Sequence, residues 1–144
     1  MKTSITFFLV LFMVSAFAQS DEEQVKQVVT KAYVQGIHNG GPTADIRAGF
    51  HPTFSMLRLM DNQVKPLPIE EWIANIEKSR SQQTSAPEKT EGKFVSVTIA
   101  GNAANVVLEL YRSGKKVFTD NLLLYKFSEG WRIVSKTYFR HPST

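Results

Sequence analysis

The chain has 144 residues, contains no cysteine and carries a formal net charge of +4 at pH 7. The lack of cysteine excludes disulfides, thiolate catalysis and cysteine metal ligands, so an apolar core must hold the fold together. The positive charge is small and scattered, and no nucleic-acid-reading motif accompanies it, so we expect no nucleic-acid partner.

The N-terminal residues have the pattern of an export signal. Lys2 supplies a positive charge, the run 5–14 is apolar apart from Thr6, and Ala16-Phe17-Ala18 is a small-residue cleavage site. We predict that residues 1–18 are a signal peptide and that 19–144 form a single exported domain, periplasmic or secreted and free of the membrane after cleavage. The alternative is an uncleaved anchor, but the apolar run is short for a membrane span.

The next segment predicts helices packed through one apolar side. Ser20 and Glu23 form a capping-box pattern, which starts a first helix that ends near His38, before Gly40 and Gly41. Its apolar residues recur at helical spacing: Val25, Val28, Val29, Ala32 and Tyr33. A short second helix, an extended segment and a third helix follow, over Thr43–Ala48, Thr53–Met60 and the residues after Pro68.

The C-terminal third predicts four antiparallel strands: Lys93–Ala100, Ala103–Arg112, Lys115–Phe127 and Trp131–His141. Tight turns join them at Gly101-Asn102, Ser113-Gly114 and Ser128-Glu129-Gly130. Helices gathered at one end of a chain against an antiparallel sheet give an α+β domain. If this sheet is curved, it cups the helices and leaves a cavity at its open end.

The turns also predict which side chains share a face of the sheet. The more apolar face is expected to pack on the helices, with a few polar side chains lining a pocket: Thr119, Asn121, Tyr125, Ser135 and Thr137. The opposite face is expected to form a homodimer interface, or else to be exposed to solvent: Glu109, Phe118, Asp120, Leu122, Leu124, Lys136 and Tyr138. Asp120 is expected across from Tyr138 and diagonal to Lys136, and a one-residue slip in the last hairpin would turn all three inward.

The motif Phe50-His51-Pro52-x-Phe54, Trp72 on the third helix and the closing segments 119–122 and 130–134 resemble the nuclear-transport-factor-2-like superfamily. Within it, the chain is most similar to the small exported "putative lumazine-binding" branch, close to the SnoaL-like cyclases. The resemblance implies a cone-shaped α+β barrel, a homodimer packed through the sheet and a pocket between sheet and helices. That superfamily contains enzymes, binding proteins and interaction modules, so the fold alone leaves the function open.

Three functions are compatible with these residues. The first is a non-catalytic protein that binds a small, mostly apolar molecule, with Tyr33, His51, Phe54 and Trp72 completing the pocket. The second is a cofactor-free isomerase, cyclase or dehydratase of the ketosteroid-isomerase or SnoaL type, with His51 as base and Tyr33 or Tyr125 as donor. The third is a protein-interaction module with a filled cavity. We expect no cofactor. We also expect no metal, because the three histidines are scattered and lack carboxylates at ligand spacing. His38 lies at a helix end, where a cation is favoured.

Overall fold

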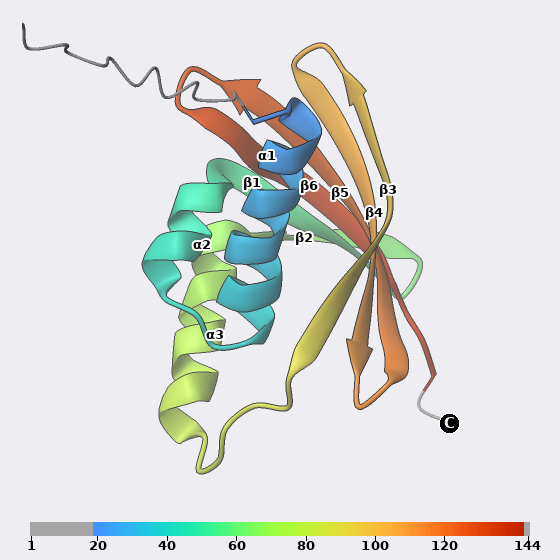
Figure 1. The fold of residues 1–144 in the computed structure, drawn as a ribbon. Coiled ribbons are helices and arrows are strands. Elements are labelled where there is room, and N and C mark those ends of the chain that lie inside the picture. The colour runs from blue at the N-terminus through green and yellow to red at the C-terminus, as the bar shows by residue number, and fades with distance from the viewer. Residues whose placement is uncertain (1–18, 143–144) are drawn as a thin grey trace, which may run out of the picture.

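The computed structural model describes residues 19–142, so the predicted signal peptide lies outside the described residues (Figure 1). The helical segments are α1 (Asp21–Val28), η1 (Val29–His38), α2 (Thr43–Gly49) and α3 (Ile69–Gln82). The strands are β1 (Phe50–Met60), β2 (Gln63–Pro68), β3 (Thr90–Ala100), β4 (Ala103–Arg112), β5 (Lys115–Phe127) and β6 (Gly130–Arg140).

The strands form one strongly twisted sheet, and the helices cover one of its faces (Figure 1). Within residues 19–142 the sheet has six strands in the order β2-β1-β6-β5-β4-β3. Neighbouring strands are antiparallel except for β1 and β6, which pair in parallel. The predicted α+β class and the packing of N-terminal helices on a curved, mostly antiparallel sheet are confirmed, although the sheet does not close into a barrel.

The predicted first helix is present but changes its hydrogen bonding midway. Ser20 Oγ accepts from the Glu23 amide at 3.2 Å and Glu23 Oε2 accepts from the Ser20 amide at 3.1 Å, so the capping box forms as expected. From Val29 the helix continues as a ten-residue π-helix, a form usually limited to single turns and often found at functional sites. This segment carries Tyr33 and His38.

Strand β2 had no counterpart among the predicted elements. It pairs with β1 through the turn Asp61-Asn62, in which both residues have positive φ, 51° and 58°. Pro66 and Pro68 argue against a strand, but β2 lies at the edge of the sheet, where a missing amide donor is tolerated.

Each hairpin ladder of the C-terminal sheet contains one irregularity, at Val95, Val117 and Val134. In each case the two residues that flank the valine form pairs with two consecutive residues of the partner strand. The valine is therefore an extra residue on its own strand. A bulge of this kind bends the strand and reverses the alternation of its side chains. The three bulges therefore decide which side chains face the helices.

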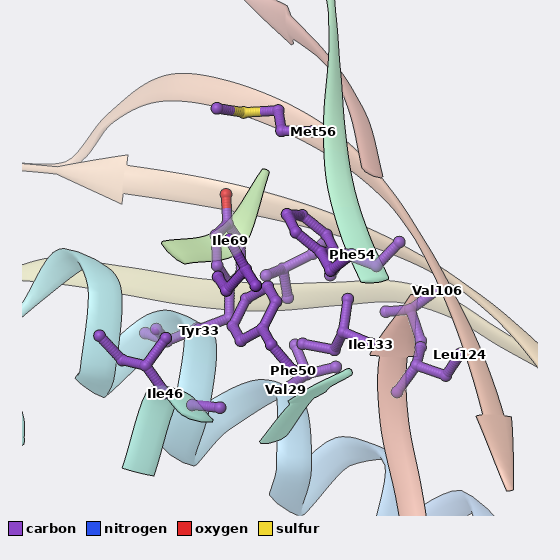
Figure 2. Packing of buried hydrophobic residues seen from close by; sticks show 14 of the residues in the cluster. Val29, Tyr33, Ile46, Phe50, Phe54, Met56, Ile69, Val106, Leu124 and Ile133 are labelled. Atoms are coloured by element: carbon purple, nitrogen blue, oxygen red, sulfur yellow. The ribbon is translucent and has the colours of Figure 1, made fainter. Parts of the chain in front are cut away.

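The apolar core lies between the helices and the concave face of the sheet (Figure 2). Tyr33, Phe50 and Phe54 are at most 1% exposed and belong to this cluster. Gly49, which ends α2, allows the close approach of α2 to η1, because a Cβ at this position would lie 2.2 Å from the Cβ of Ala32. Burial of this cluster is the main stabilising contribution available to a chain without disulfides.

Candidate functional site

The β5–β6 hairpin overturns the predicted faces of these two strands, because Phe127 pairs with Gly130 rather than with Trp131 and Val134 is an extra residue on β6. On the far side of the bulge the predicted pairs Leu123–Ser135 and Asn121–Thr137 are correct, but on the turn side Leu124, rather than Tyr125, pairs with Ile133. Because the bulge reverses the alternation, Ile133 and Lys136 both face the helices.

The predicted dimer face is therefore corrected for most of its residues. Asp120, Leu122 and Leu124 are at most 1% exposed and Lys136 is 4% exposed, so these four side chains are part of the interior. Phe118 and Tyr138 contact each other at the rim of a cavity, with ring centroids 5.8 Å apart. Glu109 is half-buried and forms an ion pair with Lys116 at 2.9 Å.

The polar residues predicted to line the pocket lie elsewhere. Asn121, Tyr125 and Thr137 are exposed on the convex face. Thr119 is half-buried, with its hydroxyl 2.9 Å from His141 Nε2, and the Ser135 hydroxyl donates to the Ser55 carbonyl at 3.4 Å.

Of the predicted pocket residues on the other elements, Tyr33 and Trp72 line a cavity, whereas His51 and Phe54 do not. The His51 ring stacks on Phe127, with centroids 4.7 Å apart, and its Nδ1 lies 2.7 Å from the Thr53 hydroxyl. Phe54 is fully buried and stacks on Trp72 at 6.1 Å. His51 thus lies apart from Tyr33, its expected hydrogen-bonding partner.

The structure instead brings together Tyr33, Asp120 and Lys136. The Tyr33 hydroxyl donates to Asp120 Oδ2 at 2.6 Å, and Lys136 Nζ donates both to the Tyr33 oxygen and to Asp120 Oδ1, each at 2.6 Å. The three groups come from η1, β5 and β6, so the cluster joins the helices to the middle of the sheet. We call it the Tyr33–Asp120–Lys136 cluster.

Burial dominates the protonation of this cluster. Burial, reinforced by the Asp120 carboxylate, raises the pKa of Tyr33 well above its ordinary value, so the phenol stays protonated and donates. Burial also lowers the pKa of Lys136, and the attraction of Asp120 opposes that change. The Lys136 ammonium additionally lies 4.8 Å from the centroid of the Tyr138 ring, a cation–π distance.

Tyr33 and Lys136 of this cluster line a cavity of about 170 Å³, which we call the inner cavity. Its other walls are mostly aromatic or apolar. The lining residues are Tyr33, His38, Met56, Trp72, Phe118, Lys136, Tyr138 and Arg140.

His38 has an unsatisfied nitrogen at this cavity. Arg112 Nη2 lies 3.4 Å from His38 Nδ1, and a guanidinium can only donate, so Nδ1 accepts and Nε2 carries the proton. Burial, together with the charges of Lys136 and Arg112, lowers the pKa of His38 from 6.5 to about 3, so the ring is neutral rather than the expected helix-end cation. Its Nε2 is buried and has no hydrogen-bond partner among residues 19–142.

A larger cavity of about 610 Å³, which we call the outer cavity, lies between α3 and the ends of η1 and β4. His38 and Trp72 line both cavities. Arg80 and Arg112 also line the outer cavity, and Arg80 donates to the carbonyls of Gly41 and Gly36 at 3.0 and 2.6 Å.

Asp120, Lys136 and Tyr138 lie next to one another as the sequence predicts, but they lie on the face of the sheet that packs against the helices, not on the opposite face. The pairing of Asp120 with Tyr138 is confirmed. The roles of His38, Met56, Arg112 and Arg140 at the cavities were not predicted, because no local pattern connects four residues on four different elements. Among the described residues, no group of three or more His, Asp or Glu side chains is placed to hold a metal ion.

A helix-covered, curved α+β sheet with a cavity between its layers defines the nuclear-transport-factor-2-like class. A family model described as "Putative lumazine-binding" matches residues 20–139, and the chain belongs to this family. The resemblance noted in the sequence is thus confirmed. A search of curated proteins found no match.

Solved structures with this fold support the class. An NTF2-like protein of unknown function from Shewanella baltica OS155 is 25% identical, with a TM-score of 0.68, over 84% of this chain and 94% of that one. A second, from Silicibacter pomeroyi DSS-3, is 22% identical with a TM-score of 0.66, over 83% and 94%. A structure described as a putative ketosteroid isomerase, from Shewanella frigidimarina NCIMB 400, is 15% identical with a TM-score of 0.57, over 83% and 97%.

Proposed function

We propose that the protein binds a small organic molecule in the inner cavity and does not transform it. The observation that carries this proposal is the buried Tyr33–Asp120–Lys136 cluster, whose Tyr33 and Lys136 line a cavity with otherwise mostly aromatic or apolar sides. A few fixed polar groups in an apolar concavity are typical of small-molecule sites. The family's description as lumazine-binding points to the same kind of function.

The cluster retains hydrogen-bonding capacity for a ligand. An ammonium has three donors, and Lys136 uses two of them, on Tyr33 and Asp120, within the described residues. Tyr33 donates one bond and accepts one, which leaves a lone pair on its oxygen. A carbonyl, hydroxyl or ring nitrogen of a ligand can bind these groups, while its apolar body contacts Met56 and Trp72.

The protonation of the cavity favours binding over catalysis. Proton abstraction requires a base with a free lone pair close to the substrate. Asp120 is fully buried and is not among the residues that line either cavity, and His38 uses its one acceptor nitrogen on Arg112. Neither group is placed to take a proton from a ligand.

The second candidate is a cofactor-free isomerase or dehydratase, and the Tyr33–Asp120 hydrogen bond is the observation that favours it. A phenol held at 2.6 Å from a carboxylate, beside an ammonium, can stabilise a developing oxyanion. Turnover of a bound enone or hydroxyketone, lost in Tyr33→Phe, would favour this candidate over a non-catalytic binder.

The binding proposal can be tested by filling the cavity. Met56 is 8% exposed and lines the inner cavity, so Met56→Trp should occupy it, with Met56→Phe as a milder variant. Leu57, the next residue on β1, is 37% exposed and provides a matched control in Leu57→Trp. Native mass spectrometry of the purified protein would detect a co-purified ligand, and a metabolite panel would be screened by thermal shift.

We expect wild type and Leu57→Trp to bind the same compounds and both Met56 variants to lose them while keeping a cooperative unfolding transition. Binding that survives in both folded Met56 variants would contradict the location. A panel that stabilises none of the proteins, with no co-purified molecule, would contradict the binding function.

We also propose that the protein is exported and forms a homodimer. The N-terminal pattern supports export, and intact-mass analysis of extracellular and periplasmic fractions should find a chain that begins at Gln19. Exposed apolar side chains on the convex face support self-association through that face: Leu123, Tyr125 and Phe139 are 48%, 49% and 60% exposed.

A further inference from the structure

We propose that the ligand is an organic anion with a planar ring, and that Arg112 binds its acidic group in the outer cavity, beside His38. This inference rests on the proposed binding function and names the class of ligand. It follows from the sizes of the cavities, the balance of charge around them and the hydrogen-bond donors of Arg112 that are not matched by protein acceptors.

The inner cavity is too small to hold a typical ligand alone. Its volume is about 170 Å³, whereas ligand pockets generally measure roughly 300–1,000 Å³. The outer cavity adds about 610 Å³, and His38 and Trp72 line both. A molecule seated against the Tyr33–Asp120–Lys136 cluster therefore extends past these two side chains.

Positive charge exceeds negative charge around the two cavities. Four cations contribute to the linings, Arg80, Arg112, Lys136 and Arg140, and one carboxylate does, Glu88. Asp120 neutralises Lys136, and Glu88 accepts a hydrogen bond from Ser113. Within residues 19–142, neither Arg112 nor Arg140 has an acidic partner within ion-pair distance.

Arg112 is oriented but its charge is not compensated. Its Nε donates to the Thr90 hydroxyl at 3.0 Å and its Nη2 contacts His38 Nδ1 at 3.4 Å, so two neutral groups fix the guanidinium. A guanidinium has five N–H donors in a planar fork, and such a fork binds a carboxylate through two parallel hydrogen bonds. The remaining donors of Arg112 suit an acidic group on a ligand.

His38 orients Arg112 rather than binding the acidic group itself. Its Nδ1 accepts from Arg112, and because Nδ1 and Nε2 point to opposite sides of the imidazole ring, Nε2 is directed away from the guanidinium. Nε2 is also buried and lacks an acceptor among the described residues. The acidic group of the ligand therefore binds the remaining donors of Arg112.

The position of Trp72 indicates that the rest of the ligand is a planar ring. Its indole is half-buried, is stacked on Phe54 and lines both cavities. Planar aromatic systems stack favourably in offset or edge-to-face arrangements on such a ring. The anchored indole is therefore preorganised for contact with a flat ligand.

The test compares acids with their uncharged amides. Isothermal titration would measure the affinity of three matched pairs of increasing size: benzoate and benzamide, indole-3-acetate and indole-3-acetamide, and 2-naphthoate and 2-naphthamide. We expect at least one acid to bind about tenfold or more tightly than its amide, because a charge-assisted bidentate hydrogen bond is available only to the acid.

The variants Arg112→Gln and Arg58→Gln separate a local from a global charge effect. Both lower the net charge equally, but Arg58 lies on β1 and donates to the Lys65 carbonyl, outside the two cavities. Arg112→Gln should remove the preference for the acid and leave the affinity of the amide within about twofold, which also shows that the site is still folded. Arg58→Gln should change neither affinity.

Equal affinity for acid and amide in the wild type, or a preference that persists in Arg112→Gln, would overturn the inference. So would the failure of all three acids to bind. In each of these cases the proposed binding function still stands if another compound binds the wild type and is lost in both folded Met56 variants.

Discussion

The ammonium of Lys136 lies 2.6 Å from the carboxylate of Asp120, and both side chains are almost completely withdrawn from solvent. Lys136 is offset by two pairs from Asp120 in the β5–β6 ladder, because Asp120 pairs with Tyr138 and Lys136 pairs with Leu122. An ion pair at such depth contributes little net stability compared with apolar residues of the same volume, yet loss of one partner leaves a buried charge. We therefore attribute this ion pair to a role at the inner cavity rather than to a contribution to the stability of the fold.

Lys136→Met should destabilise the protein strongly, by about 3–5 kcal/mol, because it leaves the Asp120 carboxylate buried without its counter-ion. Chemical denaturation would measure the free energy of unfolding. The double variant Lys136→Met/Asp120→Asn should regain part of this loss, because no charge remains buried. Lys126→Met, which breaks a partly exposed pair with Asp21, serves as control and should cost far less. A double variant no more stable than Lys136→Met would contradict the buried-charge explanation.

Tyr33→Phe should cost about 1–3 kcal/mol of unfolding free energy, because it removes the donor to Asp120 Oδ2 and leaves that buried oxygen unsatisfied while the ring packing persists. Urea denaturation would measure the change. The matched variant is Tyr125→Phe, in which the ring is 49% exposed, and it should be close to neutral. Equal effects at the two tyrosines would argue against the hydrogen-bonded cluster.

Stability should fall on acidification because of His38. The folded protein keeps the ring neutral, since burial lowers its pKa from 6.5 to about 3, whereas the unfolded chain takes up a proton below 6.5. The contribution of the neutral His38 ring to the free energy of unfolding is complete above pH 6.5 and is lost as the pH falls toward 3. Between about pH 7.5 and about pH 5, the free energy of unfolding should fall by roughly 1–2 kcal/mol because of His38.

Urea denaturation of wild type and of His38→Gln at these two pH values would measure how the free energy of unfolding of each protein changes with pH. His38→Gln should lose this part of the acid sensitivity. His51→Gln is the control, because His51 is only partly buried on the surface and stacks on Phe127. Identical pH dependence in wild type and His38→Gln would show that His38 does not stay neutral on folding.

Leu123→Lys should dissociate the proposed homodimer and leave the fold intact, because Leu123 is 48% exposed on the convex face. Light scattering would give the mass in solution. Leu122→Lys is the informative comparison: its side chain is fully buried, so a charge there should unfold the protein rather than dissociate it. A wild-type monomer, or a Leu123→Lys dimer of unchanged affinity, would contradict this interface.

Much of the fold could be predicted because its signals are local. The capping box at Ser20 and Glu23 and the turns Gly101-Asn102 and Ser113-Gly114 lie where they were expected, and strands Ala103–Arg112 and Lys115–Phe127 have the predicted bounds. Turn residues require particular backbone angles, so they mark the ends of strands irrespective of the rest of the chain.

The residues that line the cavity could not be predicted, because they come from helices and strands that meet only in the tertiary structure. Leu122, Leu123 and Leu124 are consecutive, so hydrophobic alternation does not say which of them faces the core. Turn parity was the remaining guide, and it fails wherever a bulge inserts a residue. A valine at a bulge, such as Val134, is indistinguishable in sequence from one in a regular strand.

The sequence by itself determined the order and extent of the helices and most strands, the tight turns and the α+β class, because each depends on residues close together in the chain. Only the tertiary structure decided that Asp120 and Lys136 face the helices and meet Tyr33, and that His38 and Trp72 line two cavities. The physical reason is that side chains alternate with a period of two along a strand, so each bulged valine exchanges the inner and outer faces of everything beyond it.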